Sequence, residues 1–336
     1  MRTPGLFDLQ VNGFAGVDFN DAALTAEALD HALAAMLRTG VIACLPTLIT
    51  AAPDTLASRL HALDRAVAGS RLGPTMVPGF HLEGPFLNGA EGYAGCHPRQ
   101  CMMAPDVALL DRLAAPLARP VLLITVAPEL DGALSFIETQ TRVRGRVIAL
   151  GHTAARRETI AAACDAGATL STHLGNALPQ PQPKFDNPLM AQLAEDRLAA
   201  SFIGDGIHVP PHALCVMIRA KGLSRCVLVS DAVAAAGAAP GRYRFADMTV
   251  ERTEDGAVRV PGTARLAGSA LTLDDAVRRV AALGLAAPEG AVALAGAHPR
   301  ALLAARGHRI DPGEVVWSAD LRPLRVRAGE VSVEAA

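Results

Sequence analysis

The chain has 336 residues, of which 51% are hydrophobic but only 4% aromatic, and its formal net charge is −2. Acidic and basic residues are mixed along the chain, without the basic stripe that marks a nucleic-acid-binding protein. Bulk burial must therefore come from Ala, Val and Leu, which suits parallel strands covered on both faces by Ala-rich helices. The length fits one large α/β domain, alone or with a small appendage, as well as it fits two domains.

No targeting or membrane segment is apparent in the sequence. The N-terminus, "MRTPGLFD", has no apolar signal core, and no window of 18 uncharged apolar residues occurs. The cysteines are scattered without Cys-x-x-Cys pairs, which argues against a zinc ribbon and against a disulfide scaffold. They are Cys44, Cys96, Cys101, Cys164, Cys215 and Cys226. We expect a soluble cytoplasmic protein with no membrane or nucleic-acid partner.

Short apolar runs recur at residues 6–11, 41–47, 76–83, 120–129, 147–152, 168–173, 199–206 and 226–231. Between them lie stretches with apolar residues three and four apart, as at 25–40 and 155–168, and both of these end near glycine. The alternation indicates a parallel sheet, and eight strands predict a (β/α)8 barrel of the TIM type. A doubly wound open sheet is the alternative. No Gly-x-Gly-x-x-Gly follows the first run, so the dinucleotide-binding form of that fold loses support.

The chain changes character after the eighth run. Residues 243–260 predict a hairpin with Asp255-Gly256 at its turn, and residues 271–284 return to a helical pattern. The tail, residues 314–334, alternates as short antiparallel strands do. We therefore expect a hydrolase-type barrel over residues 1–310, with the hairpin as an insertion, and a short β appendage over residues 311–336.

Residues able to bind a metal or transfer a proton end several of the runs, and in a barrel these ends meet at one mouth. They are Glu83, His152, His173 and Asp231, with His208 just beyond the seventh run. Each residue alone is weak evidence for a functional site, because a lone histidine is often structural and an aspartate at the end of a strand is often a helix cap. Together, two imidazoles and a carboxylate predict a zinc-type site with room for a water. An ion there would lower the pKa of the water, and Asp231 could move the proton, which predicts hydrolysis.

Two absences bear on the number of metal ions. The first run carries the amides Gln10 and Asn12 where many metal-dependent hydrolases have His-x-His, and no lysine follows the fourth run to bridge two ions. One divalent ion held by Glu83, His152 and His173 is therefore favoured, with zinc first and iron or cobalt also compatible. His81 shares the face of Glu83, because strand residues two apart point the same way. It is expected either to support the site from the barrel interior or to bind a second ion.

Several longer segments occur in one order over about residues 4–280: "PGLFDLQVNGFAGVDFN", "HLEGPFLN", "APE", "GHT", "THLGNALP", "DGIHV", "VSDA" and "LAGSALTLDDAVR". In these segments the sequence resembles the N-acetylglucosamine-6-phosphate deacetylases of the amidohydrolase superfamily. The resemblance implies a metal-dependent hydrolase of amino-sugar metabolism. It would remove acetate from an N-acetylated amino sugar, converting N-acetylglucosamine 6-phosphate to glucosamine 6-phosphate, and would be a homodimer.

The resemblance also implies roles for individual residues. Glu83, His152 and His173 match the metal ligands, and Asp231 matches the catalytic carboxylate. His208 matches the histidine that contacts the substrate and polarises the acetyl carbonyl. The further implied substrate contacts are His97, Asn176, Ala177, Leu266, Ala267, Gly268 and Ser269.

Three departures from the family pattern affect what we expect. The family usually has several dozen residues before the first matching segment, as part of a small β-domain, so we expect that domain to be reduced. Gly175 stands where the family has an aromatic residue. Lys184 stands where an arginine tends to reach a phosphate, often across a dimer. We therefore expect Lys184, with the backbone amides near Asn176 and Ala177, to bind the substrate phosphate.

Two alternative functions remain open. The first is a deacetylase or amidohydrolase for another small N-acyl substrate. The second is a non-catalytic sugar-binding protein on the same scaffold. The presence of Asp231 speaks against the second, because binding alone needs no proton shuttle.

Overall fold

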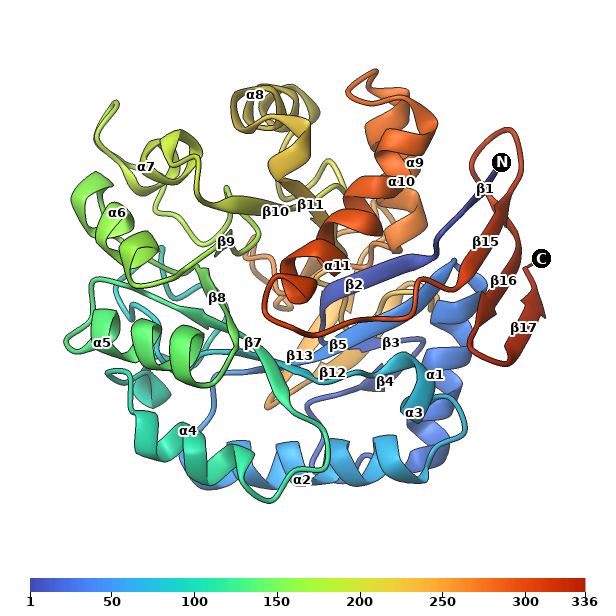
Figure 1. Cartoon of the computed structure of the whole chain (residues 1–336), viewed down its shortest axis with the longest axis horizontal. Helices are drawn as coiled ribbons and strands as arrows, with labels where there is room; N and C mark the ends of the chain where they lie inside the picture. Colours follow the sequence, from blue (N-terminus) through green and yellow to red (C-terminus); the bar gives the residue numbers. More distant parts are fainter. Residues whose placement is uncertain (336) are drawn as a thin grey trace.

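A computed structural model describes residues 1–335 and has a parallel eight-stranded sheet at its centre (Figure 1). Its strands are β2 (Leu6–Val11), β5 (Val41–Ile49), β6 (Phe80–Glu83), β7 (Val121–Val126), β8 (Val147–Leu150), β9 (Leu170–Ser171), β10 (Ala199–Ile203) and β11 (Cys226–Val229). Spatial order follows chain order from β2 to β11, without the reversal that a doubly wound sheet requires. The predicted (β/α)8 barrel is confirmed.

The first and last strands of the sheet meet and close the barrel. The backbone N–H of Asp231 donates to Gln10 O (2.9 Å), and that of Asn12 donates to Ala232 O (2.7 Å). Below them, the buried Asp8 carboxylate accepts from Ser230 N at 3.2 Å. The closure therefore places the polar end of β2 beside the residues that follow β11.

Helices surround the barrel. They are α1 (Ala26–Arg38), α2 (Pro53–Gly69), α3 (Gly73–Met76), α4 (Val107–Ala114), α5 (Ala133–Glu138), α6 (Arg157–Asp165), α7 (Pro188–Ala194), α8 (Pro211–Lys221), α9 (Leu273–Ala282), α10 (Pro288–Ala295) and α11 (Ala297–Ala304). Helix α1 shows how the sequence specifies them. The Thr25 hydroxyl caps its N-terminus by accepting from Ala28 N, and Leu29, Leu33 and Met36 bury one face.

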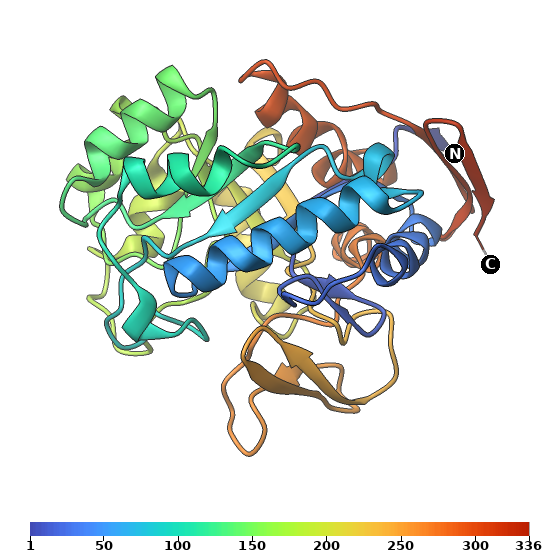
Figure 2. The same cartoon turned by 90° about the horizontal axis from the view of Figure 1, so that it is seen from below.

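A three-stranded antiparallel sheet projects from the barrel (Figure 2). It consists of β12 (Gly241–Phe245), β13 (Met248–Arg252) and β14 (Val258–Arg259), and we call it the meander. The predicted single hairpin is wrong in strand number: Asp255-Gly256 does lie in the turn from β13 to β14, but Ala246 and Asp247 form an earlier turn. Asp18 Oδ2 accepts from Ala246 N at 2.7 Å, and Arg59 pairs with Asp247 at 2.6 Å, which ties this turn to the barrel.

A second small sheet, in the order β1-β15-β16-β17, holds the C-terminal strands. It consists of β1 (Arg2–Thr3), β15 (Glu314–Trp317), β16 (Pro323–Ala328) and β17 (Val331–Glu334), so it also takes in the start of the chain. The expected small β appendage is confirmed, whereas a domain boundary at residue 310 stays a prediction. Strands β3 (Gly13–Phe14) and β4 (Val17–Asp18) form a separate pair. Within residues 1–335, no helix is both long enough and apolar enough to span a membrane.

Candidate active site

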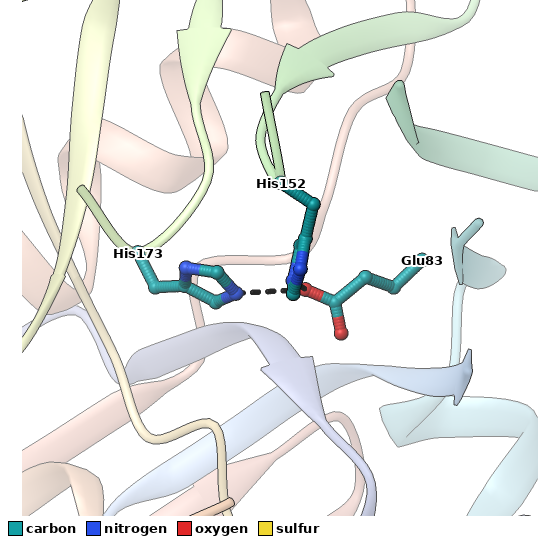
Figure 3. Close-up of side chains that lie close together, drawn as sticks. All are labelled: Glu83, His152 and His173. Carbon is teal, nitrogen blue, oxygen red and sulfur yellow. Dashed lines mark hydrogen bonds and ion pairs between the residues drawn. The ribbon is translucent and has the colours of Figure 1, made fainter. Parts of the chain in front are cut away.

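Glu83, His152 and His173 converge at the C-terminal mouth of the barrel. Glu83 is the last residue of β6, and the two histidines follow β8 and β9 by two residues each. Their candidate ligand atoms all lie within 4.8 Å of one another, and each side chain is at most 5% exposed. Figure 3 shows both imidazoles facing the carboxylate. Glu83 Oε1 lies 2.9 Å from His173 Nε2 and 3.4 Å from His152 Nε2.

The three side chains fit a divalent ion. Atoms about 2.0–2.2 Å from a tetrahedral ion lie roughly 3.3–3.6 Å from one another. The 3.4 Å separation of Glu83 Oε1 from His152 Nε2 falls in this range, and the 2.9 Å separation from His173 Nε2 is shorter, as in a hydrogen bond. His152 Nδ1 lies 2.7 Å from the Tyr93 carbonyl and, as donor, leaves Nε2 to face the site. This buried Nε2 has no hydrogen-bond partner within residues 1–335. A bound cation would satisfy it.

The protonation states of Glu83 and His152 suit a cation, whereas the pKa of His173 is raised, against burial, by its hydrogen bond to Glu83. Burial lowers the pKa of His152 to about 4, and the neighbouring His97 acts in the same direction. Burial alone would raise the pKa of Glu83, but the adjoining imidazoles of His152, His173 and His97 hold it well below its usual range. An ionised carboxylate and a neutral imidazole are the forms that bind metal.

Asp231 lies two residues beyond β11 and is tied to the cluster by the amides of β2. Asn12 Nδ2 donates to Asp231 Oδ1 at 2.8 Å, and Gln10 Nε2 donates to the same oxygen at 3.2 Å. Gln10 Nε2 also donates to Glu83 Oε1 at 2.9 Å. Burial, and then the charge of Glu83, raise the pKa of Asp231 to about 6. A carboxylate with a pKa in this range can accept and return a proton near neutral pH.

Two further histidines line the same pocket. His208 Nδ1 lies 2.6 Å from Asp205 Oδ2, which leaves Nε2 as the nitrogen free to meet a ligand. His97 Nδ1 lies 2.9 Å from Thr50 Oγ1, and its Nε2 is 3.6 Å from Glu83 Oε2. His97 therefore adjoins the cluster directly as well as the cavity.

The backbone at the site is unusual. His152, His173 and Asp231 all adopt positive φ, of 51°, 28° and 47°. Non-glycine residues there cost about 1–3 kcal/mol each and occur most often at functional sites. Gly84 (φ 92°) directly follows β6, and a Cβ at this position would clash with Thr50 Oγ1. The turn after Glu83 therefore requires glycine.

The pocket around these groups has a volume of about 360 Å³. Of the residues expected to contact substrate, His97, Asn176, Ala177, His208, Leu266 and Gly268 line it. Ala267 and Ser269 are buried outside the lining, where Ser269 Oγ donates to Ser230 O at 2.6 Å and its N–H donates to Asp231 O. Lys184 is exposed and lies outside the lining.

His81 lies in the barrel interior. Its Nδ1 is 3.2 Å from Thr47 Oγ1 and its Nε2 is 2.9 Å from Thr125 Oγ1, so both ring nitrogens are engaged. Burial lowers its pKa to about 4. This arrangement favours the supporting role over a second metal site.

No family model matches the chain. Individual proteins do match. The N-acetylgalactosamine-6-phosphate deacetylase of Escherichia coli O157:H7 is 34% identical over 305 residues, which cover 90% of this chain and 78% of that protein. The human N-acetylglucosamine-6-phosphate deacetylase is 35% identical over 318 residues, covering 89% and 74%. The chain belongs to the N-acetylglucosamine-6-phosphate deacetylase family. The resemblance stated from the sequence is confirmed.

Solved structures agree with the assignment to this family of the amidohydrolase superfamily. A mutant N-acetyl-D-glucosamine-6-phosphate deacetylase from Mycobacterium smegmatis, in complex with N-acetyl-D-glucosamine-6-phosphate, superposes with a TM-score of 0.86. It is 34% identical, and the alignment covers 98% of this chain and 86% of that one. An enamidase of the amidohydrolase superfamily, at 13% identity and a TM-score of 0.53, shares the fold.

Sequence reasoning left several residues of this family member's site without a role. Asp205 holds His208, and its position three residues before that histidine was the available signal. Glu129 accepts from Asn88 Nδ2 (2.8 Å), Thr153 Oγ1 (2.5 Å) and Ala154 N (2.6 Å), which braces the loop that carries His152. Arg265 lines the pocket, and no motif marked it.

Proposed function

We propose that this amidohydrolase removes acetate from an N-acetylated hexosamine 6-phosphate, with N-acetylglucosamine 6-phosphate as the first candidate. The observation that carries the proposal is the shared pocket: the Glu83, His152 and His173 cluster and the carboxylate of Asp231 both line it. The relatives' activities support the choice of substrate. Binding of a sugar alone would not need a buried carboxylate with a raised pKa beside a metal-type cluster.

Glu83, His152 and His173 would hold one divalent ion, and we propose zinc, because two imidazoles and a carboxylate leave a position open for a ligand. When bound, the ion supplies a Lewis acid that polarises the acyl carbonyl and lowers the pKa of a water. Iron and cobalt accept the same donors. Gln10 donates where a further histidine ligand stands in many related barrels, which supports a single ion.

The chain's own residues then carry the proton and the charge. Asp231 accepts the proton of the water that attacks the acetyl carbon, and returns it to the amide nitrogen as the C–N bond breaks. The products are acetate and the free amine. His208, oriented by Asp205, is placed to donate from Nε2 to the carbonyl oxygen as negative charge develops there.

Some of the residues expected to contact the substrate line the pocket, and others do not. We propose that His97, Asn176, Ala177, Leu266 and Gly268 touch the sugar, since all of them line the pocket. Ala267 and Ser269 would act by holding the turn that carries Leu266 and Gly268. A phosphate contact from Lys184 stays a prediction.

A substrate panel tests the proposal. Acetate release is measured by NMR for N-acetylglucosamine and N-acetylgalactosamine, each with and without a 6-phosphate, and for simple N-acetylated amino acids. We expect the phosphorylated sugars to be hydrolysed with the highest kcat/KM. The E. coli relative makes the galactose epimer a specific second candidate. Hydrolysis of the amino acids alone would identify a different N-acyl substrate, and binding of sugars without acetate release would identify a binding protein.

The expectations of a homodimer and of a cytoplasmic location stay predictions. Light scattering of the purified protein would test the first. Fractionation of the source cells would test the second.

A further inference from the structure

A second cavity, of about 380 Å³, lies at the opposite end of the barrel from the active site. Thr169 directly precedes β9, Ala199 opens β10 and Val227 belongs to β11, and we call the hollow that these three residues line the basal cavity. At their other ends, β9 and β11 lead to His173 and Asp231. The basal cavity is as large as the active-site pocket and shares no residue with it.

Arg306, which follows α11, lines the basal cavity and carries a charge that no carboxylate neutralises. Its Nη2 donates to Gly167 O at 2.6 Å, the one hydrogen bond of this side chain within residues 1–335. The side chain is partly buried, and burial lowers the pKa of the guanidinium without an acidic neighbour to offset it. Its Nε and Nη1 therefore remain as donors for an acceptor from outside the chain.

The two other arginines of the basal cavity already have their counter-charges. Arg197 Nη1 lies 2.5 Å from Asp165 Oδ1, and its Nε lies 2.8 Å from Glu195 Oε1. Arg225 Nη2 lies 3.1 Å from Asp196 Oδ1. The unpaired charge of the cavity is therefore a single one, which matches a carboxylate more closely than a phosphate monoester of charge about −2.

The wall that α11 contributes to the basal cavity is apolar. Ala301, Leu302 and Ala305 form it, and Val227 adds a further apolar side chain from β11. Thr169 supplies a hydroxyl that makes no hydrogen bond within residues 1–335. Apolar walls with a few polar groups at one place, in a hollow of a few hundred Å³, are typical of sites for small organic molecules.

We propose that the basal cavity binds a small organic carboxylate with an apolar body, and that Arg306 pairs with the carboxylate group. The planar guanidinium suits the two oxygens of such a group, and the body of the ligand would lie against Leu302 and Val227. The inference is independent of the proposed function, because no residue of the active-site pocket takes part in it.

The test titrates the metal-loaded protein with 4-fluorobenzoate and follows the fluorine resonance of this probe by NMR. Wild type should bind it saturably. Arg306→Gln should weaken binding by about 10- to 150-fold, the range of one charge-assisted hydrogen bond, and Arg306→Lys should keep part of the affinity because it retains a point charge. Arg309→Gln removes an exposed arginine that lies outside the cavity, so it is the matched control and should bind as wild type does.

Two further measurements separate charge from shape. The neutral 4-fluorobenzamide should bind at least about tenfold more weakly than the carboxylate, the lower end of the same range. Ala301→Phe, which fills the cavity and leaves its charge in place, should also weaken binding of the carboxylate.

A carboxylate probe could also bind the metal ion of the active site, so the variants decide where it binds. Wild-type affinity in Arg306→Gln or in Ala301→Phe would overturn the proposal. Equal binding of the amide and the carboxylate would overturn it as well. So would the absence of saturable binding to wild type below about 10 mM, the weakest affinity expected for a well-placed ligand of about ten non-hydrogen atoms.

Discussion

The side-chain amide of Gln10 donates to Glu83 Oε1 across the mouth of the barrel, at 2.9 Å. The same nitrogen donates to Asp231 Oδ1 at 3.2 Å, so one amide orients both a candidate metal ligand and the candidate base. A cationic or ligating side chain at this position would compete for Glu83. The uncharged amide instead leaves the carboxylate free to bind an ion while fixing its direction.

Gln10→Ala should therefore weaken metal binding by about 10- to 100-fold, the usual effect of removing a hydrogen bond that orients a metal ligand. Competition with a chromophoric chelator measures the affinity. Gln180→Ala is the matched control, because Gln180 lines the pocket, whereas the side chains that hydrogen-bond to the Glu83 carboxylate are those of Gln10 and His173. Equal affinities for the two variants would show that the Gln10 contact does not orient the ligand.

His173→Ala should lose both the ion and the activity, because it removes one of three donors whose atoms lie within 4.8 Å of one another. Elemental analysis of the purified variant measures the metal-to-protein ratio. His31→Ala, a change at an exposed histidine of α1, serves as the control and should keep wild-type occupancy. Full occupancy in His173→Ala would rule out the assigned ligand set.

Asp231→Asn keeps the shape of the side chain but removes the proton acceptor. Turnover should fall by about 10² or more, the common scale for general acid–base catalysis, while the ion stays bound. Steady-state kinetics and metal content measured on one preparation separate these effects. Near-normal turnover would show that Asp231 is not the general base and only caps the structure after β11.

Asp8 predicts a pH dependence of stability. Burial raises its pKa from 3.8 to about 7, so the folded state holds this proton more tightly than the unfolded state. Its stabilising contribution is complete below about pH 3.8 and is lost as pH rises through about 7. Asp8→Asn should therefore raise the free energy of unfolding relative to wild type at pH 8, by an amount on the order of a few kcal/mol, and show no such gain near pH 4.

Urea denaturation at both pH values measures this difference. Asp131→Asn makes the same chemical change at an exposed carboxylate and is the control. An equal stability difference between Asp8→Asn and wild type at pH 4 and pH 8 would show that Asp8 does not carry a raised pKa.

The barrel could be predicted because its signals are local. Eight apolar runs alternate with helical periodicity, and the helix over 25–40 ends near a glycine that the structure shows at positive φ, Gly40 at 86°. The candidate metal cluster followed from the same reasoning, since strand ends share one mouth. Both depended only on residue order and on the geometry common to all such barrels.

Other features could not be predicted because long-range contacts produce them. The turn from β12 to β13 contains no glycine. Ala246 takes φ 52° there, supported by Asp18, a residue more than 200 positions earlier. The placing of Arg265 in the pocket, with Lys184 outside it, likewise depends on how two loops fold back over the barrel. No periodicity or motif records such a placement.

The central claim is that one divalent ion in this cluster, together with Asp231, hydrolyses an N-acetyl amino sugar phosphate. Titrating the chelator-treated protein with Zn²⁺ while recording acetate release from N-acetylglucosamine 6-phosphate tests it most directly. Activity should be absent without the ion, rise in proportion to bound zinc and reach a plateau at about one ion per chain, the capacity of a site with three protein donors. Full activity in the metal-free protein, or no acetate release at full occupancy, would contradict it.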